Sequence, residues 1–377
     1  MDRLIPGQRA QQASAYVRTA LTFANQNRFD EAILAFRQAL QADPLNPQIH
    51  FALGNCYAEV GKIEDATKSY KRVVTLNPDF SDAHFRLGSI LSETGHIAEG
   101  FEHYMRRAVL VHGDAKSQTR KMPEPLHKTK HDSEQQEYLK GKLGRTALFH
   151  LENGQRIAGP AVNPANAVQA VADEWKTSWP QYVVLDEFLM PEALERLRLY
   201  CAGSTIWRRI YDAGYIGATP EDGFACPLMA QIAEEIRSLF PKIVGPHPFR
   251  YLGAFKYDST LSTGTNIHAD NSAVNFNLYI APDEANLDSE SGGMDIWNVA
   301  VPEGEDMRIY NGNEDKARQF LIDSRAQATS IPHKANRAIL FKSDLFHKTG
   351  SCKFQEGYLN KRINISILFG YRGSPTR

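Results

Sequence analysis

Two kinds of hydrophobic pattern divide this chain near residue 110. In residues 13–110 small and aromatic residues recur every 34 positions, whereas after residue 180 several segments alternate apolar and polar residues. A fixed long period is typical of helical pairs that stack on copies of themselves, and alternation is typical of strands with two unlike faces. The pattern therefore predicts an α+β multidomain chain, helical first and β-rich afterwards.

The N-terminal period is carried by a small residue followed four positions later by an aromatic one. The matched positions are Ala32, Ala66 and Gly100, then Phe36, Tyr70 and Tyr104, with Leu53-Gly54 matching Leu87-Gly88 and Pro44 matching Pro78. This pattern resembles the tetratricopeptide repeat, in three copies. The first copy is degenerate, with Thr19-Ala20 in place of Leu-Gly. The resemblance implies a surface that binds a protein partner or forms a homodimer. A packed extension that only stabilises the rest of the chain is the alternative.

Two later segments alternate in a way that predicts strands with one polar face. In residues 361–370 the apolar face holds Ile363, Ile365, Ile367 and Phe369, and the other face holds Arg362, Asn364, Ser366 and Leu368. In residues 274–280 the apolar face holds Val274, Phe276, Leu278 and Ile280, and the other holds Asn275, Asn277 and Tyr279. Strands that turn polar faces inward are expected to enclose a polar ligand.

The candidate chemistry lies between these strands. His268 and Asp270 are two residues apart, so on a strand their side chains would share one face. A second histidine would complete the two-histidine, one-carboxylate set that holds non-haem Fe(II) with open positions. With 12 histidines in the chain, His347 is the preferred third ligand because it ends an apolar strand over 337–346. His333, in a turn before that strand, is the rival.

His268-x-Asp270, His347 and Arg362 resemble the motif of the Fe(II)/2-oxoglutarate oxygenases, in the prolyl-4-hydroxylase-like branch. The likeness extends over about residues 180–372 and includes a strand at 182–189 with a helix at 191–199, and the Gly292-Gly293 strand. It implies a double-stranded β-helix (jelly-roll) barrel, with covering helices that we place at 190–202 and 226–240. Arg362 lies fifteen residues after His347, more than the family usually has, which an inserted loop at 351–360 would explain.

The resemblance also implies a set of ligands. Fe(II) would be held by His268, Asp270 and His347, with 2-oxoglutarate and O2 as co-substrates and ascorbate as a candidate accessory. Arg362 would bind the C5 carboxylate of 2-oxoglutarate, helped by Asn364 or Tyr279. Tyr257 would donate to the C1 end.

The implied function is hydroxylation of an unactivated C–H bond in a peptide or protein side chain, with release of succinate and CO2. Oxidation of a free amino acid or a natural-product intermediate is the first alternative. A nucleic acid demethylase ranks lower, because Leu368 stands where that group expects a second arginine. From a different class comes a repeat-containing scaffold whose barrel has lost its chemistry.

Composition and charge narrow the setting. The 377 residues carry a formal net charge of -1, so a nucleic acid surface is not expected as the main partner. The four cysteines, Cys56, Cys201, Cys226 and Cys352, form no C-x-x-C pair, as expected of reduced thiols. No segment is apolar enough for secretion or a membrane span, so we expect a cytoplasmic protein.

These patterns predict four segments: an N-terminal tail at 1–12, tetratricopeptide repeats at 13–110, a polar linker or connector at 111–178, and an oxygenase domain at 179–377. Within the connector we expect a short hairpin at 147–154 and a helix at 163–175. A charged insertion at 302–327, with a helix at 314–326, is interpreted as a lid or substrate wall, or as a solvated surface helix.

Overall fold

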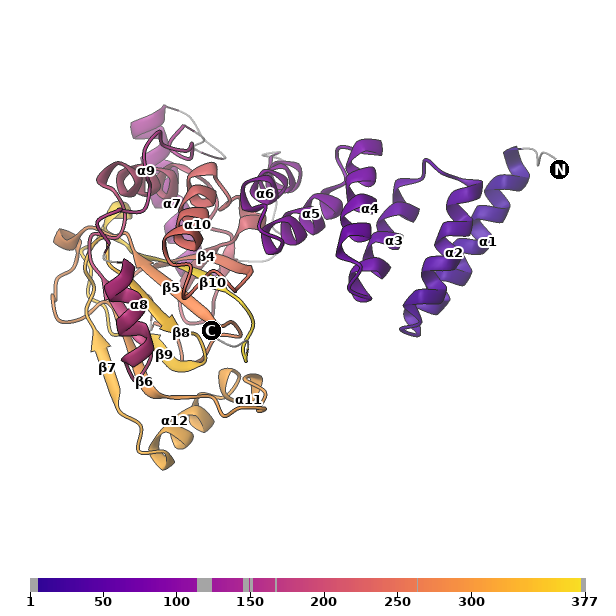
Figure 1. Cartoon of the computed structure of the whole chain (residues 1–377). Helices are drawn as coiled ribbons and strands as arrows, with labels where there is room; N and C mark the ends of the chain where they lie inside the picture. The colour runs from indigo at the N-terminus through magenta and orange to yellow at the C-terminus, as the bar shows by residue number, and fades with distance from the viewer. Residues whose placement is uncertain are drawn as a thin grey trace. The chain divides into compact units, whose positions relative to one another are not determined.

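The computed structural model describes residues 6–113, 124–144, 149, 152–166, 168–262 and 264–373, and divides into two compact units (Figure 1). Unit 1 is Met1–Val111 and unit 2 is His112–Arg377. Half of the hairpin expected at 147–154, residues 147–148 and 150–151, lies outside the described residues. None of the described helices is long and apolar enough to cross a membrane.

Unit 1 consists of helices that follow one another in antiparallel pairs, as the 34-residue period predicts. They are α1 (Pro6–Asn25), α2 (Phe29–Ala42), α3 (Pro47–Glu59), α4 (Ile63–Leu76), α5 (Ser81–Glu93) and α6 (Ile97–His112). The predicted tail is wrong in part, because residues 6–12 already belong to α1. Pro6 occupies the first helical position, where its missing N–H costs no hydrogen bond.

The repeated small residues allow close packing between paired helices. A Cβ atom on Gly54 of α3 would lie 2.7 Å from the ring of Tyr70 in α4, and Tyr70 is fully buried. A Cβ atom on Gly100 of α6 would lie 2.8 Å from the main-chain oxygen of Gly88 in α5. In the second and third repeats the aromatic residue covers the glycine of its partner helix, Tyr70 over Gly54 and Tyr104 over Gly88.

Unit 2 contains helices α7 (Leu126–Tyr138), α8 (Val168–Thr177), α9 (Pro191–Gly203), α10 (Pro227–Leu239), α11 (Arg308–Asn311) and α12 (Glu314–Asp323), the π-helical turn η2 (Leu139–Leu143) and the 3₁₀ turns η3 (Pro220–Asp222), η4 (Asp283–Ala285) and η5 (Tyr358–Asn360). Its strands are β1 (Tyr182–Leu185), β2 (Arg209–Ile210), β3 (Tyr215–Ala218), β4 (Phe249–Tyr257), β5 (Val274–Tyr279), β6 (Met294–Ala300), β7 (Ala328–Ile331), β8 (Ala338–Lys342), β9 (Leu345–Thr349) and β10 (Arg362–Phe369). Within the described residues, the helices expected at 163–175, 190–202, 226–240 and 314–326 are all present, with ends shifted by a few residues.

The strands form two antiparallel sheets that do not close into one. The larger sheet has the order β1-β8-β5-β10-β4-β3-β2, and the smaller has the order β7-β6-β9. The single strand expected at 337–346 is wrong. The chain turns at Ser343–Asp344, so that β8 belongs to the large sheet and β9 to the small one. The buried hydroxyls of Ser343 and Ser272 hydrogen bond at 2.7 Å and hold this corner.

The two faces of β5 and β10 are assigned as the alternation predicts. The Phe276 ring of β5 contacts the Phe369 ring of β10. Phe188 and Phe240 also pack on Phe276, with ring centroids 5.9 and 5.8 Å from it. Phe240 directly follows α10, so this helix covers the apolar face. The opposite face of both strands is left for polar groups.

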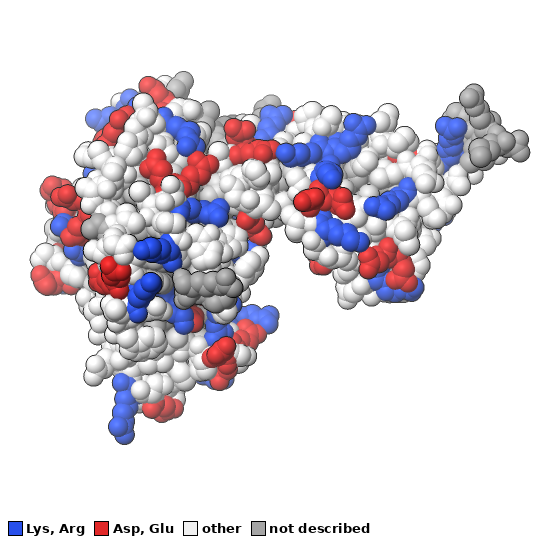
Figure 2. All heavy atoms as spheres, in the orientation of Figure 1, with Lys and Arg blue, Asp and Glu red and all other residues white. Residues whose placement is uncertain are grey.

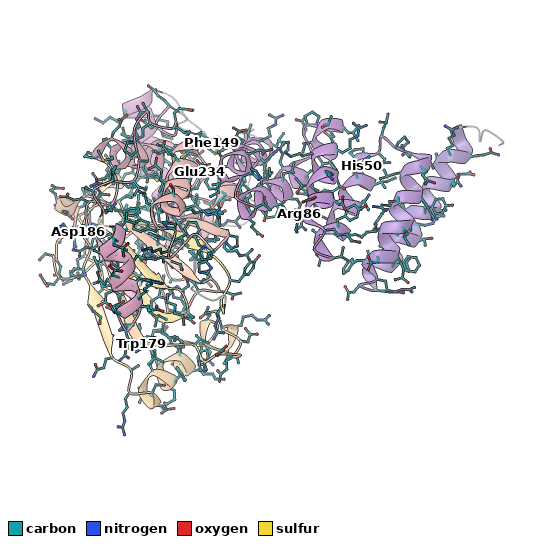
Figure 3. The ribbon with its side chains drawn as sticks, viewed as in Figure 1. His50, Arg86, Phe149, Trp179, Asp186 and Glu234 are labelled. Atoms are coloured by element: carbon teal, nitrogen blue, oxygen red, sulfur yellow. The ribbon has the colours of Figure 1, made fainter. Side chains whose placement is uncertain are left out.

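Ion pairs link segments at the surface of unit 2. Asp186, after β1, pairs with Arg337 at 2.7 Å and Lys334 at 2.8 Å, and Glu234 of α10 pairs with Arg156 at 2.9 Å (Figure 3). Acidic and basic side chains are interspersed over the visible face of each unit (Figure 2). Such a mixed surface is ordinary for a globular protein.

The region expected to be a connector contains a helix that packs on the sheet unit. Helix α7 buries Lys128, His131 and Gln135, although its sequence is polar from His127 to Glu137. The amide of Gln135 donates to the Ser204 carbonyl and to the Tyr358 hydroxyl, both at 2.9 Å. A helix that docks through polar side chains has no apolar stripe, which is why its pattern indicates a linker.

Candidate metal centre

Three side chains that the sequence analysis selected meet at one point. The ligand atoms of His268, Asp270 and His347 lie within 4.8 Å of one another, and within the described residues they are the one such group of three. The Nε2 atom of His347 lies 3.5 Å from Oδ2 of Asp270. His333, the rival ligand, is elsewhere: its Nε2 lies 3.2 Å from the Ala281 carbonyl oxygen, and its ring packs against Phe354.

The ligands are held where the chain crosses between the two sheets. His268 and His347 exchange main-chain hydrogen bonds of 3.0 and 2.8 Å, and the N–H of Asp270 donates to the Ser343 carbonyl at 2.8 Å. His268 forms an isolated bridge, so the expectation of a regular strand over residues 268–270 is wrong. The crossing into β5 and the crossing at Ser343–Asp344 therefore lie side by side and bring the three ligands together.

Main-chain carbonyls fix the orientation of both imidazoles. Nδ1 of His268 lies 2.7 Å from the Asn266 oxygen, and Nδ1 of His347 lies 2.9 Å from the Leu345 oxygen. Because a carbonyl oxygen only accepts, each Nδ1 carries the proton and each Nε2 presents a lone pair. Asn275 of β5 donates to Oδ2 of Asp270 at 2.7 Å and orients the carboxylate.

The electrostatics of the group favour the protonation states that a metal needs. Burial, and then the neighbouring His347, lower the pKa of His268 to about 4, so its ring is neutral at physiological pH. Burial acts to raise the pKa of Asp270, but the neighbouring imidazoles of His347 and His268 and the hydrogen bond from Asn275 outweigh it, and the pKa lies below its usual value. Neutral imidazoles and an ionised carboxylate are the forms that bind divalent metals.

The three ligands line a cavity of about 430 Å³. Its wall includes the polar face of β10, as the alternation predicts, together with Asn277 of β5. The β10 residues that line it are Arg362, Asn364, Ser366 and Leu368. The three candidate metal ligands and Arg362, the predicted anchor for a carboxylate, thus line the same cavity.

Arg362 is almost fully buried in this wall, with 1% of its surface exposed. Its Nε donates to the Gly292 carbonyl at 2.5 Å, Nη2 to the Gly293 carbonyl at 3.1 Å, and Nη1 to Oδ1 of Asn364 at 2.9 Å. A guanidinium has five N–H groups, so these three bonds leave two for a bound carboxylate. The side chain is held in plane and still has donors to offer.

The two glycines before β6 let their carbonyl groups approach Arg362. Gly292 has a φ of +82°, a conformation that side chains other than glycine disfavour. A Cβ atom on Gly293 would lie 1.8 Å from the Ile331 oxygen. Neither position accepts a larger residue without moving the strand.

Two tyrosines enclose the guanidinium. The Arg362 guanidinium carbon lies 4.7 Å from the ring centre of Tyr257 and 5.1 Å from that of Tyr279. The Tyr257 hydroxyl accepts a hydrogen bond from Thr349 at 3.3 Å. Burial raises the pKa of Tyr279 to about 12, so this phenol remains protonated and is able to donate.

Sequence reasoning missed Asn311, which lies at the end of α11 in the charged insertion. Its side chain accepts from the N–H of Ala269 at 3.0 Å and donates to the Ala269 carbonyl at 2.7 Å, between the ligands His268 and Asp270. Met307, Tyr310 and other apolar residues of the insertion pack on Phe346, next to the third ligand. Asn311 is the residue of the insertion that lines the cavity, whereas α12 buries Ala317 and Leu321 and exposes most of its other side chains. The insertion thus contributes a wall residue through α11, while its longer helix lies at the surface.

The comparison with protein families identifies the N-terminal region. The TPR repeat family model matches residues 20–61 and 54–95. This match confirms the predicted tetratricopeptide repeats within unit 1. No curated protein matches the chain.

Three similar solved structures each cover less than a third of this chain. The first TPR of Spaghetti (RPAP3), bound to the HSP90 peptide SRMEEVD, is 23% identical, covering 28% of this chain and 85% of that one, with a TM-score of 0.27. The translocator chaperone SycD of Yersinia enterocolitica is 16% identical, covering 29% and 81%, with a TM-score of 0.27. MamA protein is 26% identical, covering 29% and 59%, also with a TM-score of 0.27.

Proposed function

We propose that this protein is an Fe(II)- and 2-oxoglutarate-dependent hydroxylase whose two sheets are the halves of a double-stranded β-helix. One observation carries the proposal: His268, Asp270 and His347 meet in a cavity that also contains the buried Arg362. Two imidazoles and one carboxylate with free cavity space beside them suit non-haem Fe(II). A structural zinc site would instead need a fourth protein ligand.

The donor atoms fit the metal. Nε2 of His268, Nε2 of His347 and a carboxylate oxygen of Asp270 would hold Fe(II), because both Nδ1 atoms are occupied by main-chain carbonyls. The bound iron would supply O2 activation coupled to oxidation of 2-oxoglutarate to succinate and CO2. Binding and orienting the reactants fall to the chain itself.

Arg362 would bind the C5 carboxylate of 2-oxoglutarate through its two remaining N–H groups. Charge-assisted bonds of this kind contribute about 1.5–3 kcal/mol each. Asn364 would act indirectly by holding the guanidinium. Because Tyr257 packs on Arg362, we assign its hydroxyl to this same carboxylate and not to the C1 end. Burial of this wall excludes water from the charged pair.

The preferred substrate class is a side chain of a peptide or protein. The tetratricopeptide repeats support it, since stacked repeats present an extended surface that binds polypeptides. A free amino acid or natural-product intermediate is the alternative substrate. A non-catalytic interaction scaffold is the second candidate function, and the match of the repeats alone to a known family favours it.

The test is anaerobic titration of the full chain with Fe(II) and 2-oxoglutarate, followed by the visible charge-transfer absorption that a chelated 2-oxo acid gives. We expect the absorption to appear, and succinate to form slowly once O2 is admitted. Arg362→Ala should raise the KM for 2-oxoglutarate strongly, and Arg362→Lys should restore only part, because the planar fork is lost. Metal binding without any 2-oxoglutarate complex would favour the scaffold.

A further inference from the structure

A second cavity lies on the opposite face of the large sheet. It has a volume of about 240 Å³ and its wall combines apolar residues from α9, β10 and the end of β5 with three cationic side chains. Its apolar residues include Leu199, Ile280 and Ile363. Nothing in the proposed oxygenase chemistry uses this space.

The position of this cavity follows from strand alternation. Lys256, Ile280 and Ile363 are the chain neighbours of Tyr257, Tyr279 and Arg362, and adjacent strand residues face opposite ways. Lys256 and Ile363 are paired in register, and the N–H of Ile280 donates to the Ile363 carbonyl at 3.1 Å. The cavity therefore backs directly on the predicted carboxylate anchor.

Lys256 lies in the wall of the cavity as a buried cation without an acidic partner. It is 3% exposed, and its Nζ lies 3.7 Å from the ring centre of Tyr358 and 5.1 Å from that of Trp207. Within the described part of the chain no carboxylate pairs with it, whereas Lys361 beside it pairs with both Asp258 and Glu134. A buried lysine without a counterion favours its neutral form, and an anion bound beside it would favour the charged form.

The polar side chain within hydrogen-bonding distance of Lys256 is neutral. Nε2 of His131 lies 3.4 Å from Nζ, and Nδ1 of the same ring is 3.0 Å from the Asp132 carboxylate. Burial, with the neighbouring lysine, lowers the pKa of His131 to about 3. His131 therefore offers a lone pair to Lys256 and no charge.

Arg198 of α9 adds a second cation to the same wall. Its Nε donates to the Ile280 carbonyl at 2.5 Å, and its terminal nitrogens make no hydrogen bond with any other described residue. Glu195 and Leu359 mark the open rim, where Leu359 is 54% exposed. Apolar walls with unpaired cations suit a ligand that is apolar at one end and anionic at the other.

We propose that this cavity binds a small amphipathic carboxylate, with its apolar body against Leu199, Ile280 and Ile363 and its carboxylate between Arg198 and Lys256. Binding needs neither a metal nor 2-oxoglutarate, so the proposal does not depend on the proposed function. Its position behind Arg362 makes it a ligand site separate from the metal centre.

The protonation of Lys256 supplies an independent readout. Burial lowers the pKa of Lys256 to about 7, with Lys361 also lowering it and Cys201 and Glu134 acting in the opposite direction. A bound carboxylate favours the charged amine and raises this pKa. Binding at pH 8 should therefore take up a proton, seen as a dependence of the calorimetric enthalpy on the ionisation enthalpy of the buffer.

The experiment is isothermal titration of the metal-free full chain with octanoate, and with octanol and octylamine as matched probes of the same length. We expect octanoate to bind one to one with proton uptake, and the two other probes at least tenfold more weakly. Lys256→Met and Arg198→Met should each weaken octanoate binding tenfold or more. Leu199→Trp, which fills the cavity and keeps both cations, should also abolish it.

The control is Lys348→Met, which changes a cation in the wall of the metal-site cavity and should leave octanoate binding unchanged. Loss of binding in this variant would place octanoate in the first cavity and overturn the proposal. Equal binding of octanol or octylamine, or no binding of octanoate, would overturn it as well. If Lys256→Met fails to fold, Arg198→Met and Leu199→Trp still decide.

Discussion

The two units of this chain reach stable packing by opposite routes. In unit 1 each helix packs mainly against the next one along the chain, from α1 on α2 to α4 on α5. In unit 2 strand β10, the last in the chain, lies between β4 and β5 at the centre of the large sheet. The first unit is built from local contacts and the second from distant ones.

This difference decides where a change is felt. A repeat stack gains stability from each repeat and each interface, so a fault in one place weakens its neighbours. The proposed metal centre depends on two chain crossings whose residues are far apart in sequence. A substitution at either crossing is therefore expected to disturb the three ligands without weakening the repeats. The proposed metal site, which requires fixed geometry, lies on the second kind of framework.

The largest expected effect is loss of a metal ligand. Asp270→Ala or His347→Ala should weaken Fe(II) or Co(II) binding by more than the roughly 100-fold that loss of an outer hydrogen-bond partner reaches. Calorimetric titration measures the affinity, and circular dichroism of both units should stay unchanged. His333→Gln is the control and should retain metal binding; loss of binding there, with retention in His347→Ala, would make His333 the third ligand.

Two truncations separate the units and test the role of α7. Removal of residues 1–111 should leave a folded sheet unit with unchanged metal affinity, because the three ligands lie in unit 2. Removal of residues 1–143 also removes α7 and uncovers Tyr358 and Trp207, so we expect a lower melting temperature or aggregation. Equal melting temperatures for the two truncated chains would show that α7 does not stabilise unit 2 and is only a connector.

The same shorter truncation tests what the repeats do. If they hold a peptide substrate, the chain without residues 1–111 should still consume 2-oxoglutarate without substrate, while kcat/KM for the peptide falls steeply. Equal kcat/KM for the full and shortened chains would exclude that role. An insoluble product would favour a stabilising extension.

A smaller effect is expected from Gly100→Ala in the repeat stack. Helix propensity alone would make this change favourable by about 1 kcal/mol. The new Cβ would lie 2.8 Å from the Gly88 oxygen, so we expect a net destabilisation of about 1–3 kcal/mol instead. Urea unfolding measures it, with the exposed Leu34→Ala as a near-neutral control. If Gly100→Ala stabilised the protein instead, α5 and α6 would have to move apart at little cost.

The smallest effect concerns Asn311. Asn311→Ala removes both hydrogen bonds to Ala269 but no metal ligand, and we expect metal affinity to fall about tenfold. Asn311→Asp should recover little, since a carboxylate cannot donate to the Ala269 carbonyl. Unchanged metal affinity in both variants would show that the segment from His268 to Asp270 keeps its geometry without the hydrogen bonds from Asn311.

Much of this arrangement could be predicted from the sequence because the signals were local. The 34-residue period located the paired helices, and alternation assigned the faces of β5 and β10 residue by residue, including Arg362 and Asn364. His268, Asp270 and His347 were selected from their spacing, strand pattern and family likeness together. The structure places all three in one group.

What could not be predicted depends on contacts between distant segments. The turn at Ser343–Asp344 was missed because apolar residues lie on both sides of it, at 338–341 and 345–346, a pattern that fits one long strand as well as two short ones in different sheets. Helix α7 was missed because Gln135 and His131 are buried through hydrogen bonds and not through an apolar face. Asn311 carries no local pattern that would associate it with Ala269.

The side-by-side crossings between the sheets have a consequence for the lifetime of the protein. A metal held there would fasten two separately paired sheets, so its binding energy would add to resistance against unfolding, by about 2.7 kcal/mol at a free concentration of 100 Kd. We expect the metal-free chain to be digested faster by proteases than the loaded one. Iron supply would then determine how long each molecule persists as well as whether it works.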